Sequence, residues 1–249
     1  MLRLLVDLGA RAIFLCLVLV NIFRRSQFLE IVRQTYYIGA RSSLIVMLVG
    51  LFTGMVLGLQ LFYALVTFGS AGTLGSIISV ALVRELGPVL TAIMITARAG
   101  SAMAAEIGIL RISEQIDAVY SMRIDPLEYL ISPRLAASIV SFPLLTSFFD
   151  LVGMFGGYLT SVLLLGANGG TYLYRVQSSL DIADIRGGFT KALVFAVLVS
   201  SICCYEGYFC HKRPQGFGAK AVGLATISAV VRSCVVILIA DYVVTSFLM

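Results

Sequence analysis

Long hydrophobic runs, interrupted by short polar or glycine-rich segments, make up most of the chain. Residues 42–83 contain no Asp, Glu, Lys or Arg, and this stretch is too long for one helical crossing of a hydrocarbon core of about 30 Å. A glycine-rich turn at residues 68–75 divides it. The pattern predicts five membrane-spanning helices, over residues 42–67, 76–108, 135–165, 188–209 and 221–247.

An earlier hydrophobic run, at residues 12–23, is too short to span a membrane. As a helix it reaches only about 18 Å, and Arg11 and Arg24 border it. A secretory signal peptide has a similar pattern, but no convincing small-residue cleavage site follows the run. We therefore expect the region 1–41 to contain an uncleaved helix that lies along the cytosolic membrane interface.

Composition also indicates an all-α integral membrane protein. Of the 249 residues, 59% are hydrophobic and only 12% are charged, about half the charged share of a soluble domain. The formal net charge of +5 does not indicate nucleic-acid binding, because the basic residues lie at the ends of hydrophobic runs. We expect residues 1–249 to form a single polytopic membrane domain.

The distribution of Lys and Arg orients the predicted helices. With a cytosolic N-terminus, the cytosolic segments contain twelve Lys or Arg residues, whereas the outer loops contain only Arg175 and Arg186. Positive residues concentrate on the cytosolic side of membrane proteins. The sequence therefore predicts a cytosolic loop at residues 109–134 and a C-terminus on the outer side.

Charged residues occur deep in the predicted spans. Arg84 and Glu85 lie about 12–14 Å below the outer end of the second span, where a charge costs several kcal/mol unless it is paired or hydrated. One interpretation is a structural ion pair, and the other is a polar patch in a water-accessible cavity that holds a headgroup. Lys191, in the fourth span, favours the second, because it can pair with Glu85 or bind a phosphate.

Other residues within the spans have simpler interpretations. Gly50, Gly54 and Gly58 recur on one helix face and permit close helix packing, either within one chain or across a dimer. The remaining intramembrane charges are interpreted as local pairs or snorkelling side chains, with a proton relay as the alternative. They are Asp150, Glu206, Arg232 and Asp241.

The predicted cytosolic loop contains signals for two short helices. Ser113 can cap the first and Asp125 the second, in which Pro126 takes the first helical position. Two ordered helices in a short loop indicate a docking surface for a partner, while a well-built connector is the alternative. The residues expected to form the docking segment are Glu114, Gln115, Ile116 and Asp117.

Cysteines and catalytic motifs add little chemistry. The five cysteines lack the spacing of a disulfide framework, so packed thiols are expected. A metal site among Cys203, Cys204, Glu206, Cys210 and His211 is the alternative. The chain contains no P-loop motif and no visible catalytic triad. We therefore expect no enzyme activity, no metal and no cofactor in this chain.

Several sequence blocks resemble the MlaE family of ABC-transporter permeases. They are residues 83–91 (VRELGPVLT), 97–108 (ARAGSAMAAEIG), 114–118 (EQIDA) and 125–126 (DP), together with 54–60 (GMVLGLQ) and the segment around Lys191. The resemblance covers nearly the whole chain and is weakest before about residue 30. Family members commonly have Gly-Arg where this chain has Ala97-Arg98.

The resemblance implies a function that composition alone does not. Such permeases form homodimers in the bacterial inner membrane, with two cytosolic ATPase subunits that bind ATP and Mg. They move phospholipid between that membrane and a periplasmic MCE-domain protein, often with a small STAS-domain partner, and so maintain outer-membrane lipid asymmetry. The resemblance also implies that Glu114 to Asp117 belong to the helix that couples to the ATPase.

A lipid cavity at the dimer interface, open toward the periplasm, is a further implication of the resemblance. Its expected lining is Arg84, Glu85 and Lys191, with Leu57, Gln60, Ala64 and Phe68 near the acyl chains or the rim. The main rival is an ion-coupled secondary transporter that uses the buried charges and needs no ATPase. A channel is a weaker rival, because no ring of like charges is evident.

Overall fold

The computed structural model describes residues 9, 14, 28–212 and 218–248. Within these residues the chain is helical and contains no strand, as the hydrophobic pattern predicts. The helix expected over residues 12–23 lies outside the described residues apart from Phe14, as does Cys16. The structure therefore bears on the five long helices and their connections.

Five helical segments are long and apolar enough to cross a membrane within the described part of the chain. The first comprises α2 (Phe28–Thr35), η1 (Tyr36–Ala40) and α3 (Arg41–Thr67). The second comprises α4 (Leu74–Ala81), η3 (Leu82–Leu86), α5 (Gly87–Ile95), η4 (Thr96–Gly100) and α6 (Ser101–Ile112). The others are η5 (Leu127–Ile131) with α8 (Ser132–Tyr158) and η6 (Leu159–Leu164), then α10 (Ile182–Tyr208), then α11 (Ala219–Leu248).

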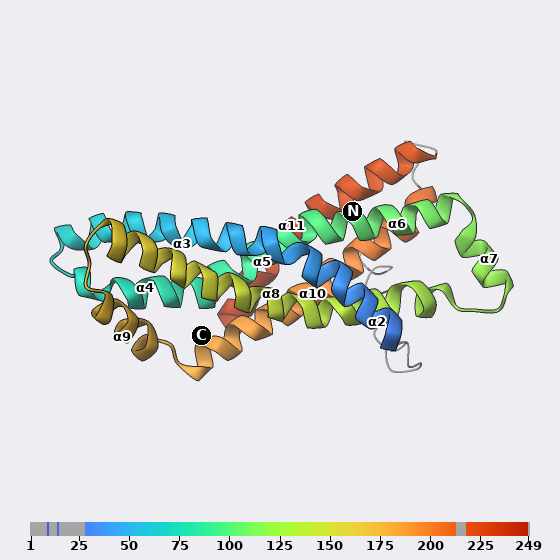
Figure 1. Cartoon of the computed structure of the whole chain (residues 1–249). Coiled ribbons are helices and arrows are strands. Elements are labelled where there is room, and N and C mark those ends of the chain that lie inside the picture. The colour runs from blue at the N-terminus through green and yellow to red at the C-terminus, as the bar shows by residue number, and fades with distance from the viewer. Residues whose placement is uncertain (1–8, 10–13, 15–27, 213–217, 249) are drawn as a thin grey trace.

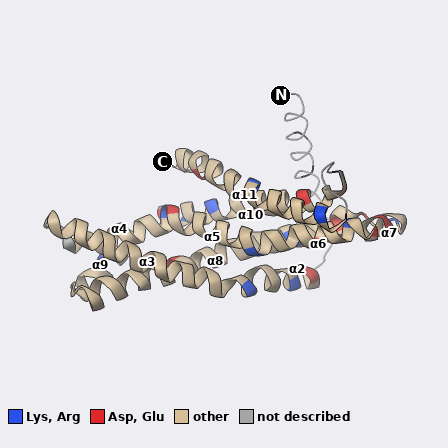
Figure 2. Ribbon diagram, turned by 90° about the horizontal axis from the view of Figure 1, so that it is seen from above, with Lys and Arg blue, Asp and Glu red and all other residues tan. Residues whose placement is uncertain are grey.

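Four short elements connect these segments. They are η2 (Ala71–Thr73), α7 (Gln115–Ser121), α9 (Gly169–Ser179) and η7 (Cys210–Lys212). Figure 1 shows an elongated bundle, with α7 at one end and the α3–α4 turn and α9 at the other. Figure 2 shows Lys, Arg, Asp and Glu gathered mainly toward the α7 end of the bundle, with a smaller group part-way along it and very few toward the α3–α4 turn. Long helices with few charges along much of their length fit a membrane-spanning protein.

The five predicted spans are confirmed, but all five begin earlier than expected, the first and the third by the widest margins. The first begins at Phe28 because α2 and η1 continue into α3 without a break. The third begins at Leu127 because the π-helical turn η5 continues into α8 without a break. The π-helical turn η5 precedes Pro133 and accommodates a residue that cannot donate a backbone hydrogen bond.

Helix α3 packs against α8 of the same chain along its glycine face. A Cβ atom added to Gly54 would lie 1.8 Å from the backbone oxygen of Gly153, so only glycine permits this approach. Gly50 and Gly58 also face the backbone of α8. The opposite face of α3 carries exposed apolar side chains, including Phe52.

Two buried apolar clusters hold the bundle together. The larger includes the fully buried rings of Phe142, Phe149 and Phe195. The smaller lies toward the α7 end and contains Ile116, which anchors α7 to the bundle. Helix α7 is therefore fixed to the spans by burial of an apolar side chain.

The sulfur-containing cluster proposed as an alternative metal site is built from separate packing contacts. Cys203, Cys204 and Cys210 are buried in apolar packing, and Glu206 forms an ion pair with Arg232 of α11. No group of three or more His, Cys, Asp or Glu among the described residues has the geometry to hold a metal ion.

Candidate functional site

The π-helical turn η3 positions Arg84 and Glu85 in the middle of the second span. Pro88 follows this turn, and its missing N–H group leaves a carbonyl of the preceding turn without its usual helical partner. A π turn widens the helix locally, and such turns occur often at functional sites. The Arg84 side chain remains 46% exposed in the single chain.

Lys191 of α10 lies at the centre of a charged cluster that joins three spans. Its Nζ donates hydrogen bonds to Glu85 Oε2 at 2.6 Å and to the Arg84 carbonyl oxygen at 2.9 Å. It also forms an ion pair with Asp241 Oδ1 of α11 at 3.1 Å. The Lys191 side chain is only 3% exposed, so these three contacts replace the water that an ammonium group would otherwise require.

Arg84 has a second acidic partner at the start of α10. Its Nε donates to Asp184 Oδ1 at 2.7 Å, while Asp184 Oδ2 accepts a hydrogen bond from the backbone N–H of Asp181 at 3.3 Å. Asp184 therefore caps its own helix and holds Arg84 at the same time. The remaining nitrogens of the Arg84 guanidinium are available to an anionic group.

Close helix contact creates a cavity around this cluster. A Cβ atom at Gly188 would lie 2.6 Å from the backbone oxygen of Val83, so a glycine is required for α10 to approach η3. The cavity has a volume of about 470 Å³. Its lining residues are Arg84, Glu85, Ala183, Asp184, Gly187, Gly188, Lys191, Thr245 and Leu248.

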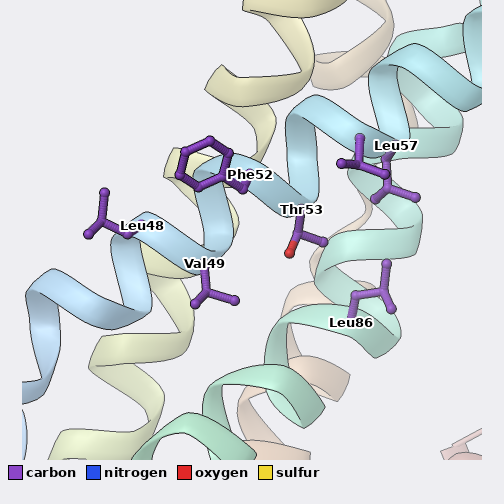
Figure 3. Close-up of a pocket in the computed structure, with 7 residues that line it drawn as sticks. Leu48, Val49, Phe52, Thr53, Leu57 and Leu86 are labelled. Atoms are coloured by element: carbon purple, nitrogen blue, oxygen red, sulfur yellow. The ribbon is translucent and has the colours of Figure 1, made fainter.

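A second, apolar cavity lies on the other side of η3, against α3. It has a volume of about 490 Å³, and Figure 3 shows Leu86 of η3 and Leu57 of α3 on its wall. Its lining residues are Leu48, Val49, Phe52, Thr53, Val56, Leu57 and Leu86. Glu85 and Leu86 are neighbours in sequence but line different cavities, so a polar site and an apolar site share one turn of helix.

The structure brings some of the predicted site residues together and leaves others apart. Arg84, Glu85 and Lys191 form one cluster. Leu57 lines the apolar cavity, whereas three further residues of the predicted site lie on the exposed face and end of α3 and line neither cavity. These three are Gln60, Ala64 and Phe68.

Three residues of the charged cluster were missed in the sequence. Asp184 falls outside the predicted spans, Asp241 is interpreted only as a local pair or snorkelling side chain, and Thr245 carries no charge that would mark it. Thr245 Oγ1 lies 3.4 Å from Glu85 Oε1. A usable signal existed for two of them: Asp181 and Asp184 have the spacing of a helix capping box, and Asp241 is a charge within a predicted span.

The loop at residues 109–134 forms the helix α7, which does not start where the sequence predicts. Ser113 does not cap it, because its hydroxyl donates back to the Ile109 carbonyl at the end of α6. Glu114 takes a left-handed conformation with φ of 58°, and α7 begins at Gln115. Asp117 forms a 2.7 Å ion pair with Arg111.

The second predicted helix cap in this loop, Asp125, is present in the structure. Asp125 Oδ1 accepts a hydrogen bond from the backbone N–H of Leu127 at 2.9 Å, so Asp125 does cap a helix. That helix is the start of the third span, and Pro126 occupies its first helical position as predicted. The loop therefore contains one free-standing helix, α7.

Sequence comparison identifies the family. The Permease MlaE family profile matches residues 31–247, which include α3, η3, α7, α10 and nearly all of α11. The chain belongs to the MlaE permease family. It is therefore a multi-pass membrane protein of the permease type, and the blocks that suggested the resemblance carry the charged cluster and α7.

Relatives of this MlaE family permease cover most of its length. A protein of Haemophilus influenzae named "Intermembrane phospholipid transport system permease protein MlaE" is 39% identical over 90% of this chain and 84% of its own length. A "Probable ABC transporter permease protein" of Rickettsia typhi is 37% identical over 97% and 92%. The chloroplast protein TRIGALACTOSYLDIACYLGLYCEROL 1 of Arabidopsis thaliana is 36% identical over 84% and 58%.

Proposed function

We propose that this chain is the permease subunit of an ATP-driven transporter that moves phospholipid between the bacterial inner membrane and a periplasmic MCE-domain partner, and so maintains outer-membrane lipid asymmetry. The observation that carries the proposal is the charged cluster around Lys191, which lies within the spans next to an apolar cavity. The name of the Haemophilus relative supports phospholipid transport, and the name of the Rickettsia relative supports a role as an ABC-transporter permease.

The chemistry of a phospholipid matches the two cavities that meet at η3. Arg84 is half-exposed, and its guanidinium can bind a phosphate through two N–H groups. Leu57 and Leu86 line a cavity with almost no polar surface, which suits an acyl chain. In this arrangement Lys191 holds the turn that presents Arg84, and Gln60, Ala64 and Phe68 form the outer rim.

The exposed apolar face of α3 supports assembly as a homodimer. Its other face is sealed against α8 by glycines, so the apolar cavity can be closed by α3 of a second copy. A cytosolic ATPase that binds ATP and Mg would dock on α7 (Glu114, Gln115, Ile116 and Asp117), and a STAS-domain protein is a further candidate partner. In the proposed orientation α7 lies on the cytosolic side of the membrane, and the N-terminus lies on the same side.

Phospholipid that copurifies with the complex tests the headgroup site. We expect Arg84→Leu to reduce bound phospholipid about tenfold, because it removes a charge-assisted contact with the phosphate. Arg186→Leu is the matched control: Arg186 is exposed and lies near the start of the same helix, α10. Lipid mass spectrometry of both purified variants gives the readout, and equal lipid in both would contradict the assignment of Arg84.

An energisation experiment separates this proposal from an ion-coupled secondary transporter. The reconstituted complex should transfer phospholipid with ATP in the absence of any ion gradient. Transfer driven by a proton or sodium gradient without ATP would support the rival, in which the Lys191 cluster is a coupling-ion site.

A further inference from the structure

A polar cavity of about 700 Å³ lies between α2, the start of α3, α6 and α8. Its lining residues are Glu30, Arg33, Gln34, Tyr36, Tyr37, Arg41, Glu106, Leu110 and Arg134. It shares no residue with the two cavities at η3. Of the three, it is the one with several arginines, and they outnumber its two glutamates, so its lining favours an anion over a cation.

Arg134 gives this cavity its binding capacity. The side chain is only 7% exposed, and its Nη2 donates to Glu106 Oε2 at 3.1 Å. Its Nε and Nη1 are buried and have no hydrogen-bond partner. Buried donors without partners are costly, and two N–H groups of one guanidinium match two oxygens of a phosphate.

Arg41 supplies a second cation without a competing acid. Its guanidinium lies over the Tyr37 ring, 5.2 Å from the ring centroid, and forms no ion pair with a described carboxylate. The two acids of the cavity have other partners within it: Glu106 pairs with Arg134, and Glu30 accepts a hydrogen bond from the Gln34 amide at 2.9 Å and lies 3.9 Å from Arg33. A phosphate would therefore meet two arginines that retain free N–H groups.

The surroundings favour a lipid phosphate over a soluble one. Phe28 and Leu29 of α2 are exposed apolar residues beside Glu30, so the wall of the cavity continues into a surface suited to acyl chains. Gln34 adds selectivity, because its Oε1 is buried without a donor. An ammonium or hydroxyl group next to the phosphate would satisfy it.

We propose that this cavity binds the headgroup of a phospholipid from the leaflet at the α7 end, separate from the transport site proposed at η3. Arg134 and Arg41 hold the phosphate, and Gln34 accepts a hydrogen bond from the headgroup. The bound lipid links α2 to α6 and α8. Phosphatidylethanolamine and phosphatidylglycerol carry both required groups, whereas phosphatidylcholine has no headgroup donor.

Native mass spectrometry of the full-length chain, titrated with each lipid, tests the proposal. The transport-site variant Arg84→Leu serves as background, so lipid bound at η3 does not obscure the result. We expect Arg41→Gln to weaken phosphatidylethanolamine binding about tenfold, and Arg175→Gln, an equal charge change on exposed α9, to leave it unchanged. Unchanged binding in Arg41→Gln would overturn the proposal.

Two further variants keep the test decisive. Arg134→Lys retains the charge that pairs with Glu106 but removes the forked donors, so it should fold and still lose phospholipid affinity. Gln34→Leu should abolish the preference for phosphatidylethanolamine over phosphatidylcholine, and a preference that persists would exclude Gln34 as the acceptor. Displacement of the lipid by inorganic phosphate at equal concentration would assign the cavity to a soluble phosphate and overturn the lipid assignment.

Discussion

The ion pairs in the middle of the bundle and those at its α7 end are built differently. Lys191 is 3% exposed and contacts groups from η3 and α11. At the α7 end, the partners Arg111 and Asp117 are 19% and 61% exposed. The buried ammonium group of Lys191 must replace its water with these contacts, although its partners Glu85 and Asp241 stay 39% and 21% exposed, whereas both members of the Arg111–Asp117 pair keep water.

This difference assigns different roles to the two regions. In the interior, loss of one partner leaves a charge in an apolar environment, so the pairs fix how α10 and α11 pack on η3. At the α7 end the charges contribute little to the fold and are free to meet a partner. Variants in the two regions should therefore separate stability from association.

The largest expected effect is on Lys191. Lys191→Met leaves Glu85 and Asp241 facing each other without a cation, and we expect it to lower the free energy of unfolding by about 3 kcal/mol. Thermal unfolding of the purified chain in mild detergent measures this loss. The triple variant that also carries Glu85→Gln and Asp241→Asn should recover most of the lost stability, because no unpaired charge remains.

A control on the same helix sharpens this prediction. Arg186 also lies on α10 but is exposed, so Arg186→Met should change stability by less than about 0.5 kcal/mol. If Lys191→Met unfolded at the same temperature as the parent protein, the cluster would be hydrated, and the contrast between the two regions would disappear.

An intermediate effect is expected at Asp184, which lies at the border between the interior and the exposed surface. Asp184→Ala removes both the α10 capping contact and the partner of Arg84. We expect a loss of about 1–2 kcal/mol, measured by the same unfolding experiment. Asp184→Asn keeps a capping oxygen and should lose less. Equal losses in both variants would show that the ion pair with Arg84, and not the cap, carries the stabilisation.

The sequence was sufficient to predict the five spans and the intramembrane charges Arg84, Glu85 and Lys191. Both depend on local features: hydrophobic runs of helical length, and charges that interrupt them. The predicted contact between Glu85 and Lys191 followed from their similar depth in the membrane. Glu85 and Lys191 are 106 positions apart in the sequence, and the sequence does not show which further residues join them: Asp241 stands out as a charge within a span, but its partner does not, and Thr245 does not stand out at all.

The remaining features depend on tertiary structure. The π turns η3 and η5 each lie just before a proline, but a proline in the sequence does not by itself distinguish a π turn from a kink or a helix start. Serine is a common N-cap residue, yet the hydroxyl of Ser113 donates to a carbonyl of α6. The end of one helix and the start of the next compete for this hydroxyl. Such choices are decided by packing, in this case by the burial of Ile116.

The smallest effect on stability is expected at Asp117, on the exposed side of the comparison. Asp117→Lys breaks the pair with Arg111, but Arg111 keeps its hydrogen bond to His211 at 3.1 Å and its contact with the Tyr208 ring. The loss of stability should stay below about 1 kcal/mol. If α7 is the docking helix for the ATPase, the same variant should weaken ATPase association at least about tenfold.

Copurification of the ATPase, quantified per permease chain, measures this association. Asp117→Asn removes the charge without reversing it and should weaken association less than Asp117→Lys, because it adds no repulsion. Arg175→Glu reverses a charge on α9, at the other end of the bundle, and should have no effect. Normal ATPase recovery with Asp117→Lys would make α7 a connector. An unfolded Asp117→Lys variant would instead show that an exposed pair can stabilise this bundle as strongly as the buried Lys191 cluster, which the exposure of its two partners argues against.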